Sequence, residues 1–202
     1  MIFKKERVDN MSKTPELEHE IKGKKIKISN ASPEDAEELL NYMKQVFSET
    51  EFLLRQPEEF EMTVAEEKEF LENMNQSENN IFIIARVDGK IAGNLGFTGS
   101  DLNRYSHQGE FGMSVLKDYW GHGIGSLLMK TLIDWARENG ITRISLRVDE
   151  NNERGRKLYE KFGFQQEGIL KNKKKLSDGN YRNEIVMARL LTNEISSDVK
   201  SQ

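Results

Sequence analysis

Three glycines within five positions make the stretch YWGHGIGS, residues 119–126, the first candidate for chemistry. The apolar run LLMKTLIDWA follows at once, so the glycines stand at the start of an expected helix. A helix start offers unpaired backbone N–H groups and a positive dipole end to an anion, and glycine lets phosphate oxygens reach those amides. The stretch therefore fits a phosphate-binding loop, although the glycines alone fit a tight strand-to-helix turn equally well.

Two common phosphate-binding motifs do not match this stretch. A Walker loop needs Gly-Lys-Ser/Thr at its end, and none follows. The dinucleotide pattern GxGxxG needs a third glycine where Ser126 or Leu128 stands, and no series of parallel βαβ units follows. The remaining interpretation is a pyrophosphate that is bound by successive main-chain amides beside a mixed sheet.

The elements that position this loop follow from hydrophobic periodicity and turn signals. Strands are predicted at residues 25–29, on both sides of Asp88-Gly89 within 81–99, at 109–116, at 141–148, and in a final pair joined by a long basic connection within 164–190. Helices are predicted at residues 32–47, 63–74, 124–139 and 152–163. We therefore expect an α/β fold, a mixed central sheet flanked by helices in the order β-α-α-β-β-β-α-β-α-β-β.

Length and composition indicate one soluble domain. The chain has 202 residues, of which 36% are hydrophobic, and this is enough for a single core. No apolar run reaches the roughly 18 residues of a membrane span, and the first residues lack the apolar centre of a signal peptide. We expect a cytoplasmic protein without a membrane partner. A net charge of −4 does not indicate a general affinity for nucleic acid.

Two residue types narrow the chemistry further. Because the chain has no cysteine, disulfides, thiolate metal ligands and a cysteine nucleophile are excluded. Its three histidines, His19, His107 and His122, form no ligand-spaced cluster, so no metal is expected. Residues 1–22 are polar and aperiodic and are predicted to be a flexible arm, in which Met11 is an alternative start. The folded domain is predicted over 23–193, with a polar tail at 194–202.

Residues 115–164 resemble the acetyl-CoA-binding half of the GNAT superfamily of N-acetyltransferases. That family's signature is Gln/Arg-x-x-Gly-x-Gly/Ala, then Asn-x-x-Ala-x-x-Leu-Tyr, then Gly-Phe, and all occur here in order within VLKDYWGHGIGS and NNERGRKLYEKFGF. Trp120 replaces the usual Gln or Arg, and Gly155 replaces the Ala. The resemblance implies a GNAT-like sheet and direct transfer of an acetyl group from acetyl-CoA to a primary amine of a small molecule, peptide or protein, in a ternary complex.

The resemblance also assigns cofactor-binding roles. Two strands must splay to admit the pantetheine, and the edge of one of them, at Met113, Ser114 and Val115, pairs with the pantetheine amides. The pyrophosphate is bound by the loop and the helix start, at Gly121, His122, Gly123, Ile124, Gly125 and Ser126. Asn152 hydrogen-bonds to the pantetheine arm, and it also fits a plain helix N-cap; both roles can hold at once.

Acetyl transfer to an amine poses two proton problems. An alkylammonium with a pKa near 10 must lose a proton, which costs about 4 kcal/mol at pH 7. Glu110 is the candidate base and is otherwise an exposed strand residue, whereas Arg147, at the comparable place on the next strand, cannot be one. Tyr159 occupies the motif position of the acid that protonates the leaving CoA thiolate, and its alternative role is that of a packing aromatic.

We expect the first two helices and the loop between them to form the part of the pocket that binds the acceptor. The acids of this loop suit a cationic amine; they are Glu49, Glu51, Glu58, Glu59 and Glu61. The basic run Lys171–Lys175 fits an attraction for the cofactor's ribose phosphate or a solvated hairpin. The rival function is a non-catalytic CoA-binding sensor or regulatory domain. The uncovered final strands are compatible with a homodimer.

Overall fold

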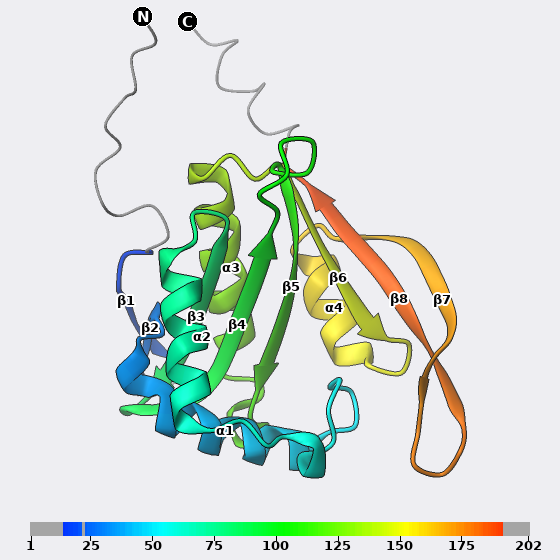
Figure 1. Cartoon of the computed structure of the whole chain (residues 1–202), viewed down its shortest axis with the longest axis horizontal. Helices are drawn as coiled ribbons and strands as arrows, with labels where there is room; N and C mark the ends of the chain where they lie inside the picture. Colours follow the sequence, from blue (N-terminus) through cyan, green and yellow to red (C-terminus); the bar gives the residue numbers. More distant parts are fainter. Residues whose placement is uncertain (1–13, 22, 192–202) are drawn as a thin grey trace, which may run out of the picture.

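The computed structural model describes residues 14–21 and 23–191, in which helices lie on both faces of one mixed sheet (Figure 1). Within this part of the chain the strand order is β1-β2-β3-β4-β5-β6-β8-β7. The strands are β1 Leu17–Ile21, β2 Lys24–Asn30, β3 Asn80–Val87, β4 Lys90–Gly99, β5 Gln108–Val115, β6 Arg143–Asp149, β7 Gln165–Lys175 and β8 Tyr181–Leu190. The helices are α1 Ala36–Glu49, α2 Val64–Gln76, α3 Ile124–Glu138 and α4 Glu153–Lys161.

The α/β fold expected from the sequence is confirmed, and from β2 onward the elements follow the predicted order. Local side-chain chemistry explains two of the helix starts. Thr63 and Glu66 form the predicted capping box at the start of α2, where the Glu66 N–H donates to Thr63 Oγ1 at 3.2 Å. Asn152 caps α4, because its Oδ1 accepts a hydrogen bond of 2.9 Å from the Gly155 N–H.

Strand β1 lies where the sequence predicts a flexible arm. Leu17 and Ile21 pack against the main core, while Glu18 and Glu20 between them are exposed. The alternation in LEHEI is strand-like, but with only two apolar residues it has little signal until β2 is available to pair with it. The expectation of an unstructured arm is therefore wrong for residues 17–21. Residues 1–13 and the predicted tail lie outside the described residues.

The basic run Lys171–Lys175, expected within the connection of the final pair, is instead the end of β7. Lys174 is paired in register with Arg182, and Lys175 with Tyr181, on β8. The ladder shifts register between Leu170 and Lys174, so one irregular stretch of strand accommodates the run. The turn at Asp178-Gly179 is present, with Gly179 at φ 87°.

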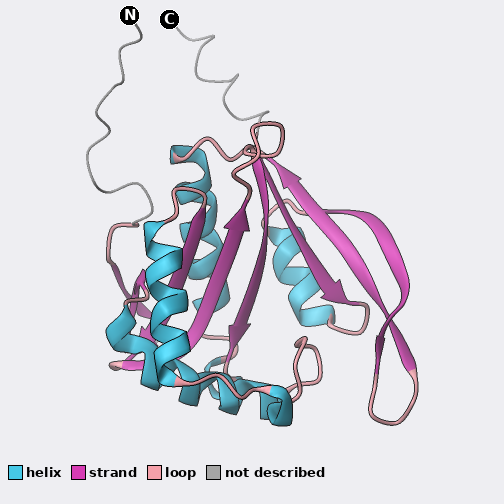
Figure 2. Ribbon diagram, in the orientation of Figure 1, coloured by secondary structure: helices cyan, strands magenta, loops and turns pink. Residues whose placement is uncertain are grey.

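Two apolar clusters pack on opposite faces of the sheet. The larger one joins α3 and α4 to the sheet, with Leu132 and Trp135 of α3 and Tyr159 of α4 among its buried side chains. The other joins α1 and α2 to the sheet through buried Leu39 and Leu71. In Figure 2, α1 and α2 lie at the β2–β4 half of the sheet, and no helix lies in front of β6 and β8. One half of this face is therefore open.

Strands β5 and β6 separate along their length. They pair in parallel only between Gln108–Glu110 and Arg143–Ser145, whereas β4 pairs with β5 as far as Val115. From Phe111 onward, β5 therefore has one free edge that faces the gap. The predicted splay of two strands is confirmed. None of the helices in the described residues is long and apolar enough to cross a membrane.

Candidate cofactor and acceptor site

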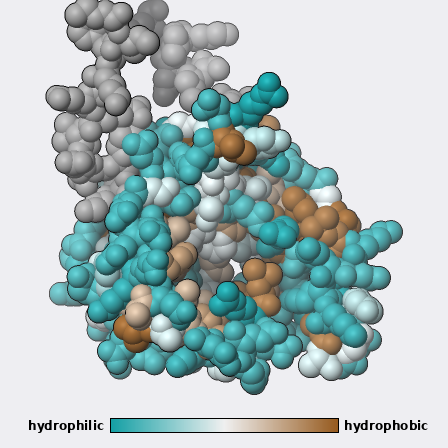
Figure 3. Space-filling view, viewed as in Figure 1, coloured by the Kyte–Doolittle hydropathy of each residue, from teal (hydrophilic) through white to brown (hydrophobic). Residues whose placement is uncertain are grey.

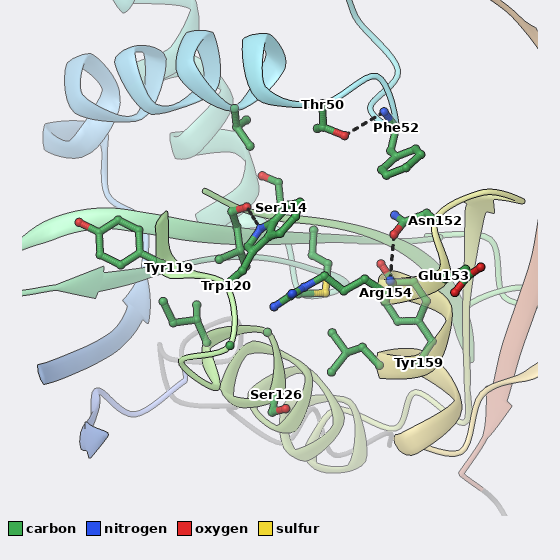
Figure 4. A pocket seen from close by; sticks show the side chains of 18 of the residues that line it. Thr50, Phe52, Ser114, Tyr119, Trp120, Ser126, Asn152, Glu153, Arg154 and Tyr159 are labelled. Carbon is green, nitrogen blue, oxygen red and sulfur yellow. Dashed lines mark hydrogen bonds between the residues drawn. The ribbon is translucent and has the colours of Figure 1, made fainter. Parts of the chain in front are cut away.

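A pocket of about 490 Å³ occupies the gap between the separated strands. Four segments contribute its walls: Val46, Thr50, Phe52 and Leu53 in and after α1; Met113, Ser114 and Val115 of β5; Tyr119, Trp120, Gly121, Gly123, Ile124, Gly125 and Ser126 before and in α3; and Asn151, Asn152, Glu153, Arg154, Gly155, Leu158 and Tyr159 before and in α4. In the space-filling view most of this side is hydrophilic, and apolar surface shows in and beside a hollow near its centre (Figure 3). Figure 4 shows the pocket from close by.

All but two of the residues predicted for the site line this one pocket. The exceptions are Glu110 and His122. The His122 ring turns back on its own loop, where Nδ1 lies 3.1 Å from the Trp120 carbonyl oxygen. Its side chain therefore does not line the pocket, and only the main chain at this position stays a candidate for phosphate binding.

The free edge of β5 presents its main chain to the pocket. The Leu116 N–H donates to the Ala92 carbonyl on β4 at 3.0 Å. Because bonding alternates along an antiparallel pair, the N–H and C=O groups of Met113 and Val115 point away from β4, toward the gap. The Val115 carbonyl accepts from Trp120 Nε1 at 2.7 Å, and the other groups are suited to bind an extended chain with amides of its own, as an added strand does.

The backbone conformation of the loop before α3 requires glycine at two positions. Gly121 and Gly123 have φ of 78° and 79°, left-handed values that favour glycine. The first helical hydrogen bond of α3 runs from the Leu127 N–H to the Gly123 carbonyl, at 3.0 Å. The three N–H groups before it, at residues 124–126, therefore have no acceptor within the helix. They lie at the pocket, at the positive end of a 15-residue helix.

Gly125 has a different role, because its backbone is ordinary helix. A Cβ there would lie 3.0 Å from Leu158 Cδ2 and 3.4 Å from Met113 Cε. Its hydrogen side chain therefore lets α3 approach α4 and β5 around the pocket. Gly155, where the signature has Ala, lies under the Asn152 side chain, and a Cβ there would meet Asn152 Nδ2 at 2.9 Å.

Tyr159 is a buried residue whose hydroxyl reaches the pocket. Its ring makes edge contacts with Phe111 and Phe164, at centroid distances of 5.7 and 6.3 Å, so the predicted packing role is real. Among the described residues its hydroxyl makes no hydrogen bond. Burial raises the pKa of Tyr159 to about 12. The hydroxyl therefore keeps its proton at neutral pH, which is what a proton donor requires.

Glu110 lies outside the pocket, on the α1 side of the sheet. Its carboxylate accepts from Arg147 Nε at 2.9 Å, and both side chains are exposed.

Ser114, which shares this side of β5, does line the pocket and belongs to a polar chain that the sequence did not reveal. The Tyr42 hydroxyl lies 2.7 Å from Ser114 Oγ, and Ser114 Oγ donates to Asn94 Oδ1 at 2.6 Å. This chain ties β5 to α1 and β4.

The pocket wall where the sequence predicts the acceptor is mainly apolar. It is formed by Val46, Thr50, Phe52 and Leu53, and none of the five acids of this region lines the pocket. Two of them bind the protein itself: Glu49 accepts from the Lys117 N–H at 2.7 Å, and Glu51 from Arg182 at 2.6 Å. The loop acids therefore do not line this pocket, and two others, Glu59 and Glu61, border a separate hollow with Arg55, Met62 and Glu66.

Glu51 is part of an ion-pair network between the acceptor wall and the final hairpin. The Lys174 ammonium donates to the Glu51 carbonyl at 2.7 Å and lies 2.8 Å from a carboxylate oxygen of Asp149. The Asp149 side chain is only 1% exposed, and Arg182 lies between Asp149 and Glu51. The network ties β6, β7 and β8 to the residue next to Phe52. Lys174 is thus occupied within the protein.

Fold and pocket together define an α/β protein in which a pocket suited to an extended, anion-bearing molecule lies between two splayed strands. The sequence profile described as "Acetyltransferase (GNAT) family" matches residues 40–164. The chain belongs to the GNAT acetyltransferase family, as the resemblance in its sequence indicates. It is therefore a GNAT acyltransferase by descent.

Several named relatives are N-acetyltransferases. The chain is 34% identical to L-amino acid N-acetyltransferase AaaT of Escherichia coli over 54% of this chain and 67% of that protein. It is 40% identical to the [ribosomal protein bS18]-alanine N-acetyltransferase of Haemophilus influenzae, over 39% of this chain and 53% of that protein. A GNAT-family acetyltransferase of Streptococcus pneumoniae superposes with a TM-score of 0.79 at 33% identity, covering 82% of this chain and 99% of the other.

One relative of known structure contains the family's co-substrate. YncA of Salmonella typhimurium, solved with its cofactor acetyl-CoA, has a TM-score of 0.71 at 17% identity, over 82% of this chain and 94% of that protein. At this level of identity the similarity concerns the fold.

Proposed function

We propose that this protein transfers the acetyl group of acetyl-CoA to the primary amine of an acceptor, by direct attack in a ternary complex. One observation carries the proposal. A single pocket joins the free edge of β5, the unbonded N–H groups at the start of α3, the cap residue Asn152 and the hydroxyl of Tyr159. These four groups match the ones that the family uses to bind acetyl-CoA and to protonate the leaving thiolate. They come from segments up to 46 residues apart, from Met113 to Tyr159.

The chain's own groups suit the co-substrate. The main chain of Met113 and Val115 pairs with the pantetheine amides, and the N–H groups of residues 121–126 bind the pyrophosphate. Asn152 Oδ1 is already used by the helix cap, so its Nδ2 is the group that remains to donate to the pantetheine arm. Acetyl-CoA supplies the acetyl group as a reactive thioester.

Two side chains handle the protons. When the amine nitrogen bonds to the acetyl carbon, the carbon–sulfur bond breaks, and the Tyr159 hydroxyl protonates the thiolate that leaves. Glu110 accepts the proton of the incoming ammonium. Because its carboxylate lies outside the pocket and is bonded to Arg147, this transfer runs through water along the open face of the sheet.

The pocket favours an α-amine beside an apolar side chain as acceptor. Val46, Phe52 and Leu53 offer apolar contact, and among the residues that line the pocket the one carboxylate is Glu153, on α4. A site with a distant base suits an amine that loses its proton easily: the N-terminal α-amino group of a peptide, with a pKa near 8, costs about 1 kcal/mol to deprotonate at pH 7, against about 4 for an alkylamine. Relatives named for L-amino acids and for a protein alanine point the same way.

Release of free CoA thiol across an acceptor panel tests this function. The panel contains apolar and polar amino acids, peptides with an N-terminal alanine, and polyamines, each with saturating acetyl-CoA. We expect turnover with apolar α-amines above all. Tight acetyl-CoA binding without turnover on any acceptor would favour the CoA-binding sensor instead. The homodimer and the cytoplasmic location remain predictions from the sequence.

A further inference from the structure

Trp120 and Arg154 form a stacked pair beside the glycine loop. The Arg154 Cζ lies 4.7 Å from the centroid of the Trp120 ring, and both residues line the pocket. Trp120 precedes Gly121 directly, while Arg154 is in the first turn of α4. Figure 4 shows the two side chains meeting across the pocket, between the start of α3 and the loop that carries Phe52. The pair therefore connects the glycine loop before α3 with the first turn of α4.

The Trp120 ring has a fixed position. Its Nε1–H donates to the Val115 carbonyl on the free edge of β5, at 2.7 Å. Trp120 is 36% exposed, and one face of its ring is in contact with the Arg154 guanidinium. A guanidinium that stacks on an indole gains from the ring's quadrupole and keeps its N–H groups at the rim free to bind another group.

Arg154 has no acidic partner among the described residues; Arg156, on the same helix, has none either, but its guanidinium donates to the Glu150 carbonyl at 3.4 Å. Arg147 pairs with Glu110, Arg182 with Glu51 and Asp149, and Arg143 with Glu167. Among the described residues, Arg154 makes neither an ion pair nor a hydrogen bond through its guanidinium; its one contact of note is the Trp120 ring. An exposed arginine that is held in place yet unpaired, beside amides that can bind an anion, is suited to a phosphate.

We propose that Arg154 binds the pyrophosphate of acetyl-CoA, and that Trp120 is the platform that holds its guanidinium there. This assignment rests on the proposed function. The loop amides donate hydrogen bonds but carry no full charge, so a cation at the rim balances the charge of the pyrophosphate. Where the family signature has Gln or Arg at the position of Trp120, this chain provides its cation from α4 instead.

Binding constants of single variants test the assignment. Calorimetry measures the Kd of acetyl-CoA and of S-acetylpantetheine, which lacks the phosphates. We expect Arg154→Ala to raise the Kd of acetyl-CoA about 10- to 100-fold and to leave that of S-acetylpantetheine within about twofold. Arg154→Lys recovers part of the loss. Trp120→Ala weakens acetyl-CoA binding, and Trp120→Phe, which keeps a ring, restores most of it.

Lys161→Ala is the matched control. Lys161 is a cation on the same helix, 6.0 Å from the Phe162 ring centroid, but it does not line the pocket, so its loss should leave both Kd values unchanged. Fluorescence gives a second readout, because the chain has two tryptophans and the other, Trp135, is buried. The change in emission on binding acetyl-CoA should be lost in Trp120→Phe.

Two results would overturn the assignment of Arg154 and leave the proposed function intact. One is wild-type affinity for acetyl-CoA in Arg154→Ala, and the other is an equal loss of affinity for both ligands. If neither ligand binds to the wild-type protein, the proposed function fails and the assignment with it.

Discussion

The carboxylate of Glu110 lies 2.9 Å from the guanidinium of Arg147, at the point where β5 and β6 begin to separate. Both side chains project on the open, α1-facing side of the sheet, opposite to buried Phe111 and Leu146. The candidate base thus lies outside the pocket lining and is paired with a cation. In the proposed mechanism, the proton of an ammonium in the pocket therefore reaches Glu110 through water.

Replacing Glu110 by Gln tests this base. The amide has a similar shape but cannot take a proton, so we expect kcat/KM to fall about 10- to 100-fold, most at low pH, where more of the amine is ammonium. Acetyl-CoA affinity should hardly change. Glu167→Gln is the control, because Glu167 pairs with Arg143 in a comparable exposed ion pair. A wild-type pH profile in Glu110→Gln would assign the step to water alone.

Tyr159→Phe removes the hydroxyl and keeps the ring contacts with Phe111 and Phe164. Turnover at saturating acetyl-CoA should fall about 10²-fold or more, with acetyl-CoA affinity little changed. Because the hydroxyl makes no hydrogen bond among the described residues, the free energy of unfolding should change by less than about 1 kcal/mol. A folded, fully active variant would leave Tyr159 only its packing role and strengthen the sensor alternative.

The raised pKa of Tyr159 also makes stability depend on pH. An unfolded tyrosine titrates near pH 10, and the folded one at about 12. Below about pH 10 both states hold the proton, and its contribution to stability is fully present. As pH rises further the unfolded state loses its proton first, so the free energy of unfolding falls, by about 1 kcal/mol between pH 10 and 11 from Tyr159 alone.

Urea unfolding across this pH range checks the effect. Tyr159→Phe should flatten the decline, and Tyr42→Phe should do so separately, because burial also raises the pKa of Tyr42. Equal slopes in the wild-type protein and Tyr159→Phe would show that the Tyr159 hydroxyl is not desolvated as described.

The ion pair between Glu51 and Arg182 should control the acceptor and not the cofactor. Arg182 holds the residue next to Phe52, so Arg182→Ala frees the apolar wall of the pocket. We expect the KM for the acceptor to rise about 5- to 50-fold while the Kd of acetyl-CoA stays within about twofold. Arg143→Ala, which breaks the Glu167 pair between β6 and β7, is the control. Equal effects on both ligands would indicate a general loss of structure.

The residues that line the pocket between β5 and β6 could be predicted from the sequence better than the contacts around the pocket, for physical reasons. The glycine loop, Asn152 and Tyr159 belong to two local motifs, and the order of strands and helices brings the motifs together. The left-handed backbone at Gly121 and Gly123 is a property that glycine spacing reports directly. The splay of β5 and β6 came from the family resemblance, since no pattern within either strand encodes it.

The features that the sequence missed depend on contacts between distant side chains. The Trp120–Arg154 stack joins residues in two segments and needs both rotamers. The five loop acids looked suited to a cationic acceptor, yet Glu51 binds Arg182, which is 131 residues away. Composition indicates a charge but not its partner. The same holds for β1, whose five residues form a strand only because β2 pairs with them.

Calorimetric titration of acetyl-CoA into the wild-type protein and into Gly125→Val tests the central claim most directly. Gly125 is the suitable position because its backbone is not left-handed and the nearest atom to an added Cβ is the flexible end of Leu158, so the variant should fold; Gly123, at φ 79°, would be strained. We predict one acetyl-CoA bound by the wild-type protein, with a stabilisation of about 2.7 kcal/mol at a hundredfold excess over Kd. We predict no binding by the folded variant, and wild-type affinity in a folded Gly125→Val would contradict a cofactor site at this loop.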